Sequence, residues 1–224
     1  PSPGRSGPGE DGRMTELILA LDVPDRERAL LVARACAPHL DAIKIGYPLV
    51  LSAGLSVARE LDDLGLPLIA DFKVADIPNT NRLIAEQVFS AGFRALICQG
   101  FTGRDSVEAC VGAARSAGGL CMVVAEMSHP GALEFFSEGV AEQIARMAAG
   151  CGADGIIAPA TRPGRVRVLR KLVGDRLIWS PGVGAQGGDP RAVAGLVDAI
   201  IVGRQIYGAK DPAREAAALG FLRR

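Results

Sequence analysis

The residue types most suited to chemistry gather in one stretch, "DFKVADIPNT", which runs from Asp71 to Thr80. It follows an apolar run, residues 66–70, of the kind that forms a buried strand. Successive strand residues point to opposite sides, so Asp71 and Lys73 are expected to share one side while Phe72 faces the other. An acid and a base at the end of a buried strand are suited to moving a proton or stabilising a developing charge.

Lysine is scarce in this chain, which makes each lysine more informative. Of the 25 basic residues, only four are lysine, namely Lys44, Lys73, Lys171 and Lys210. An ammonium group can be desolvated and can release its proton, whereas a guanidinium group remains charged. Lys44 and Lys73, both placed at the ends of predicted strands, are therefore candidates for chemistry.

Eight short apolar runs alternate with segments of helical periodicity. The predicted strands are residues 17–21, 42–45, 68–71, 95–98, 120–125, 155–158, 177–179 and 199–202. The predicted helices between them include residues 25–36, 49–64, 79–91, 105–116, 135–149 and 165–173. Eight such units predict an α/β fold, a (β/α)₈ barrel in a single domain over residues 14–224.

A doubly wound open sheet is the alternative fold. It usually has fewer units and often carries a glycine-rich loop after its first strand. Here the first strand leads into Asp22-Val23-Pro24-Asp25, which is not a dinucleotide-binding fingerprint. The first 13 residues, rich in proline, glycine and serine, are expected to be a disordered extension.

Composition narrows the possible partners. The net charge is zero and 49% of the residues are hydrophobic, which favours neither a nucleic-acid nor a membrane partner. The five cysteines show no C-x-x-C spacing, and the two histidines give no metal-ligand pattern. We therefore expect a cytoplasmic protein without a metal site, whose cysteines are small core residues.

Charged residues also end the two strands that precede Asp71. Asp22 follows the first predicted strand and Lys44 lies in the second, so four charges are expected around one mouth of the barrel. Ion pairs that merely neutralise one another are the plainer interpretation. Because buried ion pairs add little net stability, four charges at consecutive strand ends favour a functional site.

Several ordered motifs resemble the orotidine 5′-monophosphate decarboxylase family, in its compact archaeal form. Asp71–Thr80 matches the signature D-x-K-x-x-D-I-P-x-T of that family. The other matching motifs, in order, are "LALD" ending at Asp22, "IKIGYPL" around Lys44, "EMSHPG" from Glu126, "SPGVGAQGGDP" from Ser180 and "IIVGRQIY" from Ile200. The match extends from Leu17 to Tyr207, nearly the whole folded chain.

The resemblance implies a reaction: decarboxylation of orotidine 5′-monophosphate to uridine 5′-monophosphate, without a cofactor, as the last step of de novo pyrimidine biosynthesis. It implies that Lys73 protonates C6 of the pyrimidine as CO₂ leaves, with Asp71 beside the departing carboxylate. Lys44 then bridges Asp71 and the ribose hydroxyls, and Asp22 contacts the ribose.

Other site residues are implied in the same way. Asp76 and Thr80 are expected to reach the site of a second subunit in a homodimer, with Ile77 among the substrate-binding residues. Ser128 is expected at the amide edge of the pyrimidine. The residues expected on the phosphate side, contributed by the loops after the last two strands, are Gln186, Gly203 and Arg204. Pro181 is a further expected substrate-binding residue.

Two departures and two other functions stay open. Gln99 stands where the family often has histidine, and Ala160 where serine is common. Related magnesium-dependent enzymes, hexulose-phosphate synthase and ketogulonate-phosphate decarboxylase, share D-x-K-x-x-D but need a further acid near the second strand, which here reads Lys44-Ile45-Gly46. A non-catalytic barrel that binds a phosphorylated ligand is the other alternative.

Overall fold

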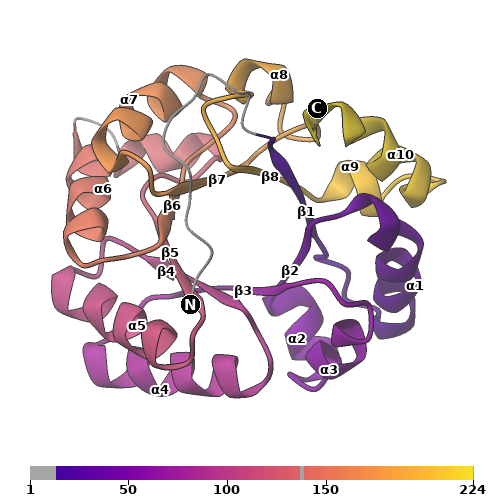
Figure 1. The fold of residues 1–224 in the computed structure, drawn as a ribbon, viewed down its shortest axis with the longest axis horizontal. Helices are drawn as coiled ribbons and strands as arrows, with labels where there is room; N and C mark the ends of the chain where they lie inside the picture. The colour runs from indigo at the N-terminus through magenta and orange to yellow at the C-terminus, as the bar shows by residue number, and fades with distance from the viewer. Residues whose placement is uncertain (1–13, 137–138, 224) are drawn as a thin grey trace.

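Eight parallel strands close into a barrel in the computed structural model, which describes residues 14–136 and 139–223. The predicted N-terminal extension, residues 1–13, lies outside these ranges. The strands are β1 (Glu16–Ala20), β2 (Ala42–Gly46), β3 (Leu68–Val74), β4 (Ala95–Gln99), β5 (Leu120–Val124), β6 (Gly155–Ile157), β7 (Leu177–Pro181) and β8 (Ala199–Val202). Each strand pairs with the next, and β8 returns to β1, so the predicted (β/α)₈ barrel is confirmed (Figure 1).

Helices surround the strands on the outside of the barrel (Figure 1). They are α1 (Arg26–Cys36), α2 (Tyr47–Ala53), α3 (Val57–Asp62), α4 (Pro78–Ser90), α5 (Arg104–Ser116), α6 (Val140–Gly150), α7 (Pro163–Val173), α8 (Pro190–Val193), α9 (Arg204–Tyr207) and α10 (Pro212–Ala218). None of the described helices is long and apolar enough to cross a membrane.

Two predicted helices differ from the structure. The helix expected over residues 49–64 is broken into α2 and α3 at Gly54, whose φ of 76° lies in the left-handed region that ends helices. The helix expected over residues 135–149 begins only at Val140, after Gly139, whose φ of 88° is left-handed; a 3₁₀ turn, η2 (Pro130–Glu134), lies earlier in the chain. The short helices α8, α9 and α10 were not predicted.

Alternation along the strands separates two apolar layers. Ile18 and Ala20 of β1 pack inside the barrel, whereas Leu17 and Leu19 pack outward against the helices. The interior layer is made of side chains from the strands alone, so the barrel is filled and does not form a pore. A cavity opens above this layer, where the strands end.

The end of β3 departs from regular strand geometry. The pairing of β3 with β4 shifts register between Ala70 and Val74, and within that shift Lys73 has a φ of 44°. Phe72 turns outward and lies between the rings of Tyr47 and Phe93. The expected separation of Phe72 from its two charged neighbours is therefore confirmed, although a bulge accompanies it.

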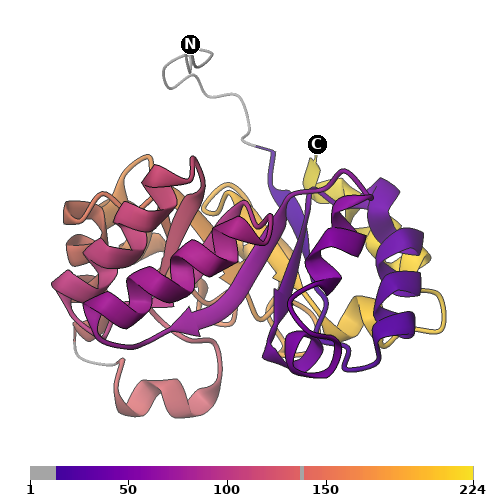
Figure 2. The same ribbon diagram turned by 90° about the horizontal axis from the view of Figure 1, so that it is seen from below.

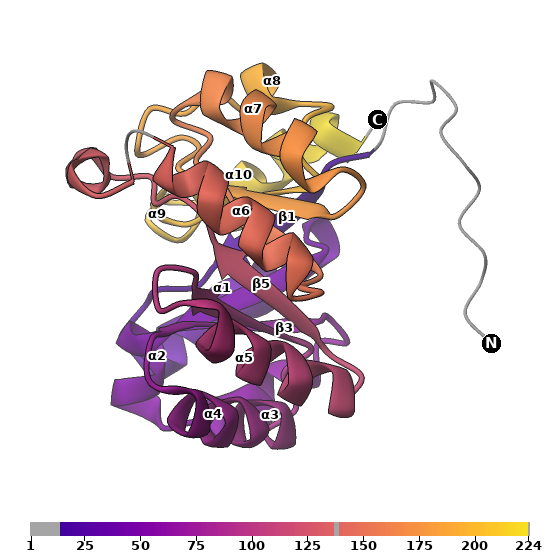
Figure 3. The same ribbon diagram turned by 90° about the vertical axis from the view of Figure 1, so that its left-hand side faces the viewer.

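One turn stands away from the barrel. The segment around η2 projects on the side opposite the start of β1 and the C-terminal end of the chain (Figures 2 and 3). Because β1 begins on the far side, this projecting turn belongs to the face where the strands end.

Because β6 and β7 pack closely, we expect that a side chain cannot be accommodated at Gly155. A Cβ there would lie 2.2 Å from the Leu177 carbonyl oxygen, so Gly155→Ala is expected to lower the free energy of unfolding by about 1–3 kcal/mol. Gly112 is the matched control: it lies within α5, and a Cβ added there would have no neighbouring atom within 4 Å, so Gly112→Ala should stabilise by about 0.5–1 kcal/mol. Urea unfolding measures both, and equal effects would contradict the packing described.

Candidate active site

A cavity of about 330 Å³ opens at the carboxyl ends of the strands. Most of the residues that the sequence singled out line it together. They are Asp22, Lys44, Asp71, Lys73, Ser128, Pro181, Gln186, Gly203 and Arg204. Residues from β1, β2, β3, β7 and β8, or from the loops after them, thus meet at one mouth, where barrels of this kind place their chemistry.

The Asp71 carboxylate binds two ammonium groups at once. Its Oδ2 lies 2.5 Å from Lys44 Nζ, and its Oδ1 lies 2.7 Å from Lys73 Nζ. Lys44 Nζ is also 3.9 Å from Asp22 Oδ1, which joins a second acid to the group. The four charges predicted at three successive strands are therefore one connected network.

Burial strengthens the electrostatic interactions among the charges of this network. The side chains of Lys44 and Asp71 are only 6% and 12% exposed, whereas that of Lys73 is 38% exposed. Burial by itself would raise the pKa of the Asp71 carboxyl, but the charges and hydrogen bonds of Lys44 and Lys73 outweigh it and lower that pKa below its ordinary value. Asp71 is thus an anion at neutral pH, and Lys73 carries the more exposed of the two ammonium groups at the cavity.

The backbone at Lys73 is strained in order to place its ammonium. Among the described residues it is the one non-glycine with a positive φ. A left-handed conformation costs a residue with a Cβ about 1–2 kcal/mol, so the surrounding structure must enforce it. Stacking on Tyr47 holds the Phe72 ring outward, and the hydrogen bond to Asp71 holds the Lys73 ammonium.

The loop after β7 folds back over the cavity through its glycines. Gly182, Gly184 and Gly187 have φ values of 99°, 71° and 86°. Gly188 approaches so closely that a Cβ would lie 2.5 Å from the Gly182 carbonyl oxygen. Gly184, Gly187 and Gly188 donate their N–H groups to carbonyl oxygens of the same loop, which fixes its shape. The loop lines the cavity together with Arg204, whose guanidinium suits a phosphate.

Ser128 and Gln186 both line the cavity beside Gly182. A Cβ on Gly182 would lie 3.3 Å from the Ser128 Cβ and 3.4 Å from the Gln186 Oε1, so both residues flank that glycine. The loop after β5 and the loop after β7 therefore meet over the mouth, and a ligand there would contact both.

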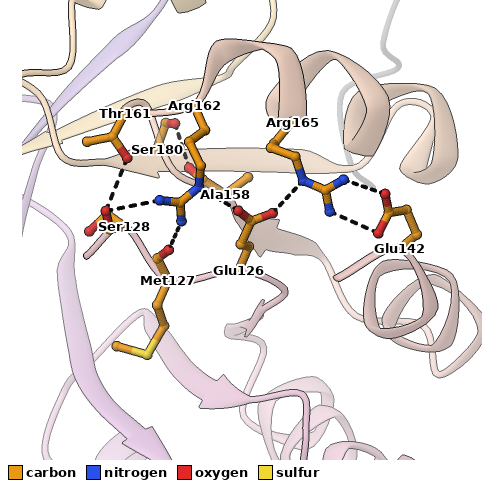
Figure 4. Close-up of polar contacts among 9 residues, drawn as sticks. All are labelled: Glu126, Met127, Ser128, Glu142, Ala158, Thr161, Arg162, Arg165 and Ser180. Atoms are coloured by element: carbon orange, nitrogen blue, oxygen red, sulfur yellow. Dashed lines mark hydrogen bonds and ion pairs between the residues drawn. The ribbon is translucent and has the colours of Figure 1, made fainter. Parts of the chain in front are cut away.

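A second charged network, which the sequence reasoning did not identify, supports the loop after β5 (Figure 4). Glu126 is fully buried, and its carboxylate binds Arg162 Nε at 2.7 Å and Arg165 Nε at 3.0 Å. Arg165 also binds Glu142 through two contacts of 2.6 and 2.9 Å. Hydrogen bonding from Arg165 lowers the pKa of the Glu142 carboxyl. The signal in the sequence was an acid directly after the apolar run of the fifth strand, with two arginines after the sixth.

This network reaches the cavity through Arg162. Its guanidinium donates to the carbonyl oxygens of Met127 and Ser128, and the Thr161 hydroxyl donates to the same Ser128 carbonyl at 3.1 Å (Figure 4). The main chain on both sides of Ser128 is thus tied to the end of β6. Glu126 fixes the guanidinium that makes those contacts.

Three predicted site residues do not line the cavity of their own chain: Asp76, Ile77 and Thr80. Two lining residues with titratable side chains, His129 and Tyr207, had not been named for a role at the cavity. His129 is exposed at the rim, and the pKa of Tyr207 is raised by burial and by the negative charge of Asp22.

The two departures lie inside the protein. Gln99 is 7% exposed, and its Nε2 lies 3.7 Å from the Met127 sulfur. Ala160 is buried, and its backbone lies close to the glycine loop, where a Cβ added to Gly188 would be 3.2 Å from the Ala160 carbonyl carbon. Four of the five free cysteines are buried in the core as expected, and Cys151 is half-buried.

A closed β/α barrel with a buried acid–base network and a glycine loop at one mouth defines a TIM-barrel enzyme. Comparison with known proteins gives the family. The model of the orotidine 5′-phosphate decarboxylase / HUMPS family matches residues 15–219. The chain belongs to this family.

Relatives with this fold are similar over nearly their whole length. The orotidine 5′-phosphate decarboxylase of Methanosarcina barkeri is 59% identical over 203 residues, 90% of each chain, and that of Thermococcus kodakarensis is 50% identical over 206 residues, 91% of this chain and 93% of the relative. A crystal structure of the Methanocaldococcus jannaschii enzyme complexed with the inhibitor BMP superposes with a TM-score of 0.90 at 41% identity, covering 94% of this chain and 99% of that one.

The buried position of Glu126 predicts a large stability loss on its removal. Glu126→Ala leaves two arginines without their shared carboxylate and should lower the free energy of unfolding by about 3–5 kcal/mol. The control is Glu86→Ala, which removes an exposed pair with Arg82 on α4 and should cost below about 1 kcal/mol. Chemical unfolding of the two variants gives the comparison, and similar losses would show that the buried network adds no stability.

Proposed function

We propose that this chain catalyses the decarboxylation of orotidine 5′-monophosphate to uridine 5′-monophosphate without a metal or cofactor, in the cytoplasm. The observation that carries the proposal is the Asp71 carboxylate held between Lys44 and Lys73 at the base of the cavity. Relatives named for this activity at up to 59% identity support it. The proposal assigns the reaction to the last step of UMP synthesis.

Lys73 is the proposed proton donor. Breaking the bond between C6 and the carboxylate carbon releases CO₂ and leaves the electron pair on C6. The ammonium of Lys73, the more exposed of the two ammonium groups at the cavity, stabilises that charge and then transfers a proton to C6. A lysine suits this task because, unlike arginine, it can release a proton and remain as a neutral amine.

The other three charges orient the donor and the ribose. Asp71 lies beside the departing carboxylate. Its 2.7 Å contact with the Lys73 ammonium also orients that group. Lys44 is nearly buried, so it is fixed between Asp71 and Asp22 and can donate to a ribose hydroxyl. Asp22 is more exposed and can accept from the same sugar.

The far end of the ligand would be bound by the loops after β7 and β8. Arg204, Gln186 and the backbone at Gly203 form the proposed phosphate site, with Pro181 on the pyrimidine side. Ser128 would contact the amide edge of the pyrimidine. Phosphate binding at a distance from C6 can stabilise loop closure and thereby lower the chemical barrier.

The proposed active unit is a homodimer. Asp76, Ile77 and Thr80 are absent from the lining of their own cavity. Asp76 and Ile77 are exposed, with Ile77 at 65%. Those properties fit residues that complete the site of a second copy across a two-fold axis.

Magnesium-dependent sugar-phosphate enzymes belong to the same broad family, so the substrate needs its own support. In this chain the ammonium of Lys44 occupies the place between Asp22 and Asp71, where a cation bound by those acids would otherwise lie. Like charges would repel there. The geometry therefore favours the pyrimidine nucleotide over a metal-bound sugar phosphate.

The activity is tested by following the ultraviolet absorbance of orotidine 5′-monophosphate with and without EDTA. Turnover is expected in both conditions, and Lys73→Ala should lower kcat by at least about 10²–10⁴-fold, the usual contribution of general acid catalysis. Lys171→Ala, an exposed lysine on α7, is the matched control and should behave as the unsubstituted chain. Turnover that requires added Mg²⁺, or a Lys73→Ala variant retaining more than about a tenth of kcat, would contradict the proposal.

The shared site is tested by complementation. Lys73→Ala and Asp76→Ala chains should each be nearly inactive as homodimers. When they exchange subunits, one site of the mixed dimer regains both residues, so activity should return to about half of that of an unsubstituted dimer. Native mass spectrometry verifies the exchange. Confirmed mixed dimers without recovered activity would show that each site takes both Lys73 and Asp76 from a single chain.

A further inference from the structure

Two buried polar side chains bind the backbone of Asp76 from inside the molecule. Asn81 Oδ1 accepts a hydrogen bond from the Asp76 N–H at 2.9 Å, and the Ser106 hydroxyl donates to the Asp76 carbonyl at 2.7 Å. Asn81 Nδ2 also donates to the Ser106 carbonyl at 3.4 Å, which links the two side chains. Both polar groups of the Asp76 peptide backbone are therefore bound by side chains.

These side chains occupy positions where apolar residues would be expected. Asn81 lies on the buried face of α4 with Ala85 and Val88, at helical spacing, and is 1% exposed. Ser106 begins the buried face of α5, next to Val107, and is 3% exposed. Burying an amide and a hydroxyl is costly unless their hydrogen bonds are made. Here the bonds that compensate the cost converge on Asp76.

Three segments are joined by this arrangement. The link between β3 and α4 contains Asp76, while Asn81 and Ser106 belong to the first turns of two helices that pack side by side (Figures 1 and 2). Because the helices are held by their own apolar contacts, they offer a rigid support for the link. Pro78, at the first position of α4, restricts the link further.

The orientation of the Asp76 side chain is fixed as a result. Its Oδ1 accepts a hydrogen bond from the Ile77 N–H at 2.7 Å, while the residue is exposed. The carboxylate does not line the cavity of its own chain. A fixed backbone with an outward carboxylate is a pre-organised arrangement for a group outside the chain.

We infer that Asn81 and Ser106 are positioning residues that hold Asp76 in the geometry needed by the active site of a second copy of this chain. They touch neither the cavity nor its ligand. Their effect on the reaction passes through Asp76 and therefore appears in the partner's site and not in their own. This inference rests on the proposed shared site.

Heterodimers of differently tagged chains, purified by two affinity steps, test where the effect appears. In the first pairing, a Ser106→Ala chain joins a Lys73→Ala chain. The working site then takes Lys73 from the Ser106→Ala chain and Asp76 from the chain with an intact Ser106, so kcat/KM should equal that of an unsubstituted chain paired with Lys73→Ala. In the second pairing, an unsubstituted chain joins a chain carrying both substitutions. Its working site uses the unsupported Asp76, and kcat/KM should fall roughly 3- to 10-fold.

The pattern across the two pairings is decisive. A loss in the first pairing, or equal activity in both, overturns the inference, because a general folding defect would follow the substituted chain or affect both pairings. Asn81→Ala in place of Ser106→Ala should give the same pattern. Ser116→Ala, an exposed serine at the other end of α5, is the control and should leave both pairings unchanged.

A second measurement links the effect to Asp76. In Asp76→Ala homodimers, adding Ser106→Ala should change the residual kcat/KM by less than about twofold, because the group being positioned is gone. A further large loss would show that Ser106 acts through other contacts and would overturn the inference. Failure of the Lys73→Ala with Asp76→Ala complementation is a separate result, which rejects the shared site itself.

Discussion

The site depends on one buried carboxylate, Asp71, which requires two positive charges to remain an anion. An unpaired carboxylate with so little exposure would take up a proton. The parallel barrel supplies the partners: Asp71 on β3 is in register with Gly46, two residues beyond Lys44 on β2, and Lys73 follows on β3 itself. Adjacent strands that end at the same rim can therefore surround an acid with two ammonium groups, which a single helix or loop could not place so rigidly.

The chain uses its two kinds of cation for different tasks at the two sides of the mouth. On the β5 and β6 side, the guanidinium of Arg162 binds the buried Glu126 carboxylate and two carbonyl oxygens at once, which makes a fixed support (Figure 4). On the β2 and β3 side, each ammonium binds Asp71 through a single short contact, and Lys73 keeps access to the cavity. A guanidinium can make several hydrogen bonds in a fixed geometry, whereas an ammonium can change its protonation state. Because lysine is scarce in this chain, Lys44 and Lys73 could be recognised in the sequence as candidates for chemistry.

The strands and the mouth could be predicted from the sequence because both follow from local patterns. Apolar runs locate all eight strands, and charged residues at their ends locate the cavity. The bulge at Lys73 could not be predicted, since its positive φ coincides with a register shift against β4 and with the Phe72 ring stack, which join residues far apart in the sequence. Glu126 was visible as an acid after a strand. Its partners, Arg162 and Arg165, come from the loop after β6 and from α7, and such long-range pairing has no local signal. The break of the second helix at Gly54 did carry a signal, a glycine within the helical pattern, which the periodicity outweighed.

The ten residues from Asp71 to Thr80 present charged side chains in two directions, because the strand conformation ends in the middle of this segment. Up to Lys73 the chain follows the strand, and alternation aims both charges into its own barrel. The positive φ at Lys73 ends that alternation, and Pro78 begins α4 only five residues later. The residues between must leave the barrel mouth, so Asp76 faces outward although it lies close to Lys73 in sequence. One short segment can thus hold a charge in its own cavity and present another to a neighbour, provided that the link between them is rigid. The buried hydrogen bonds of Asn81 and Ser106 give it that rigidity.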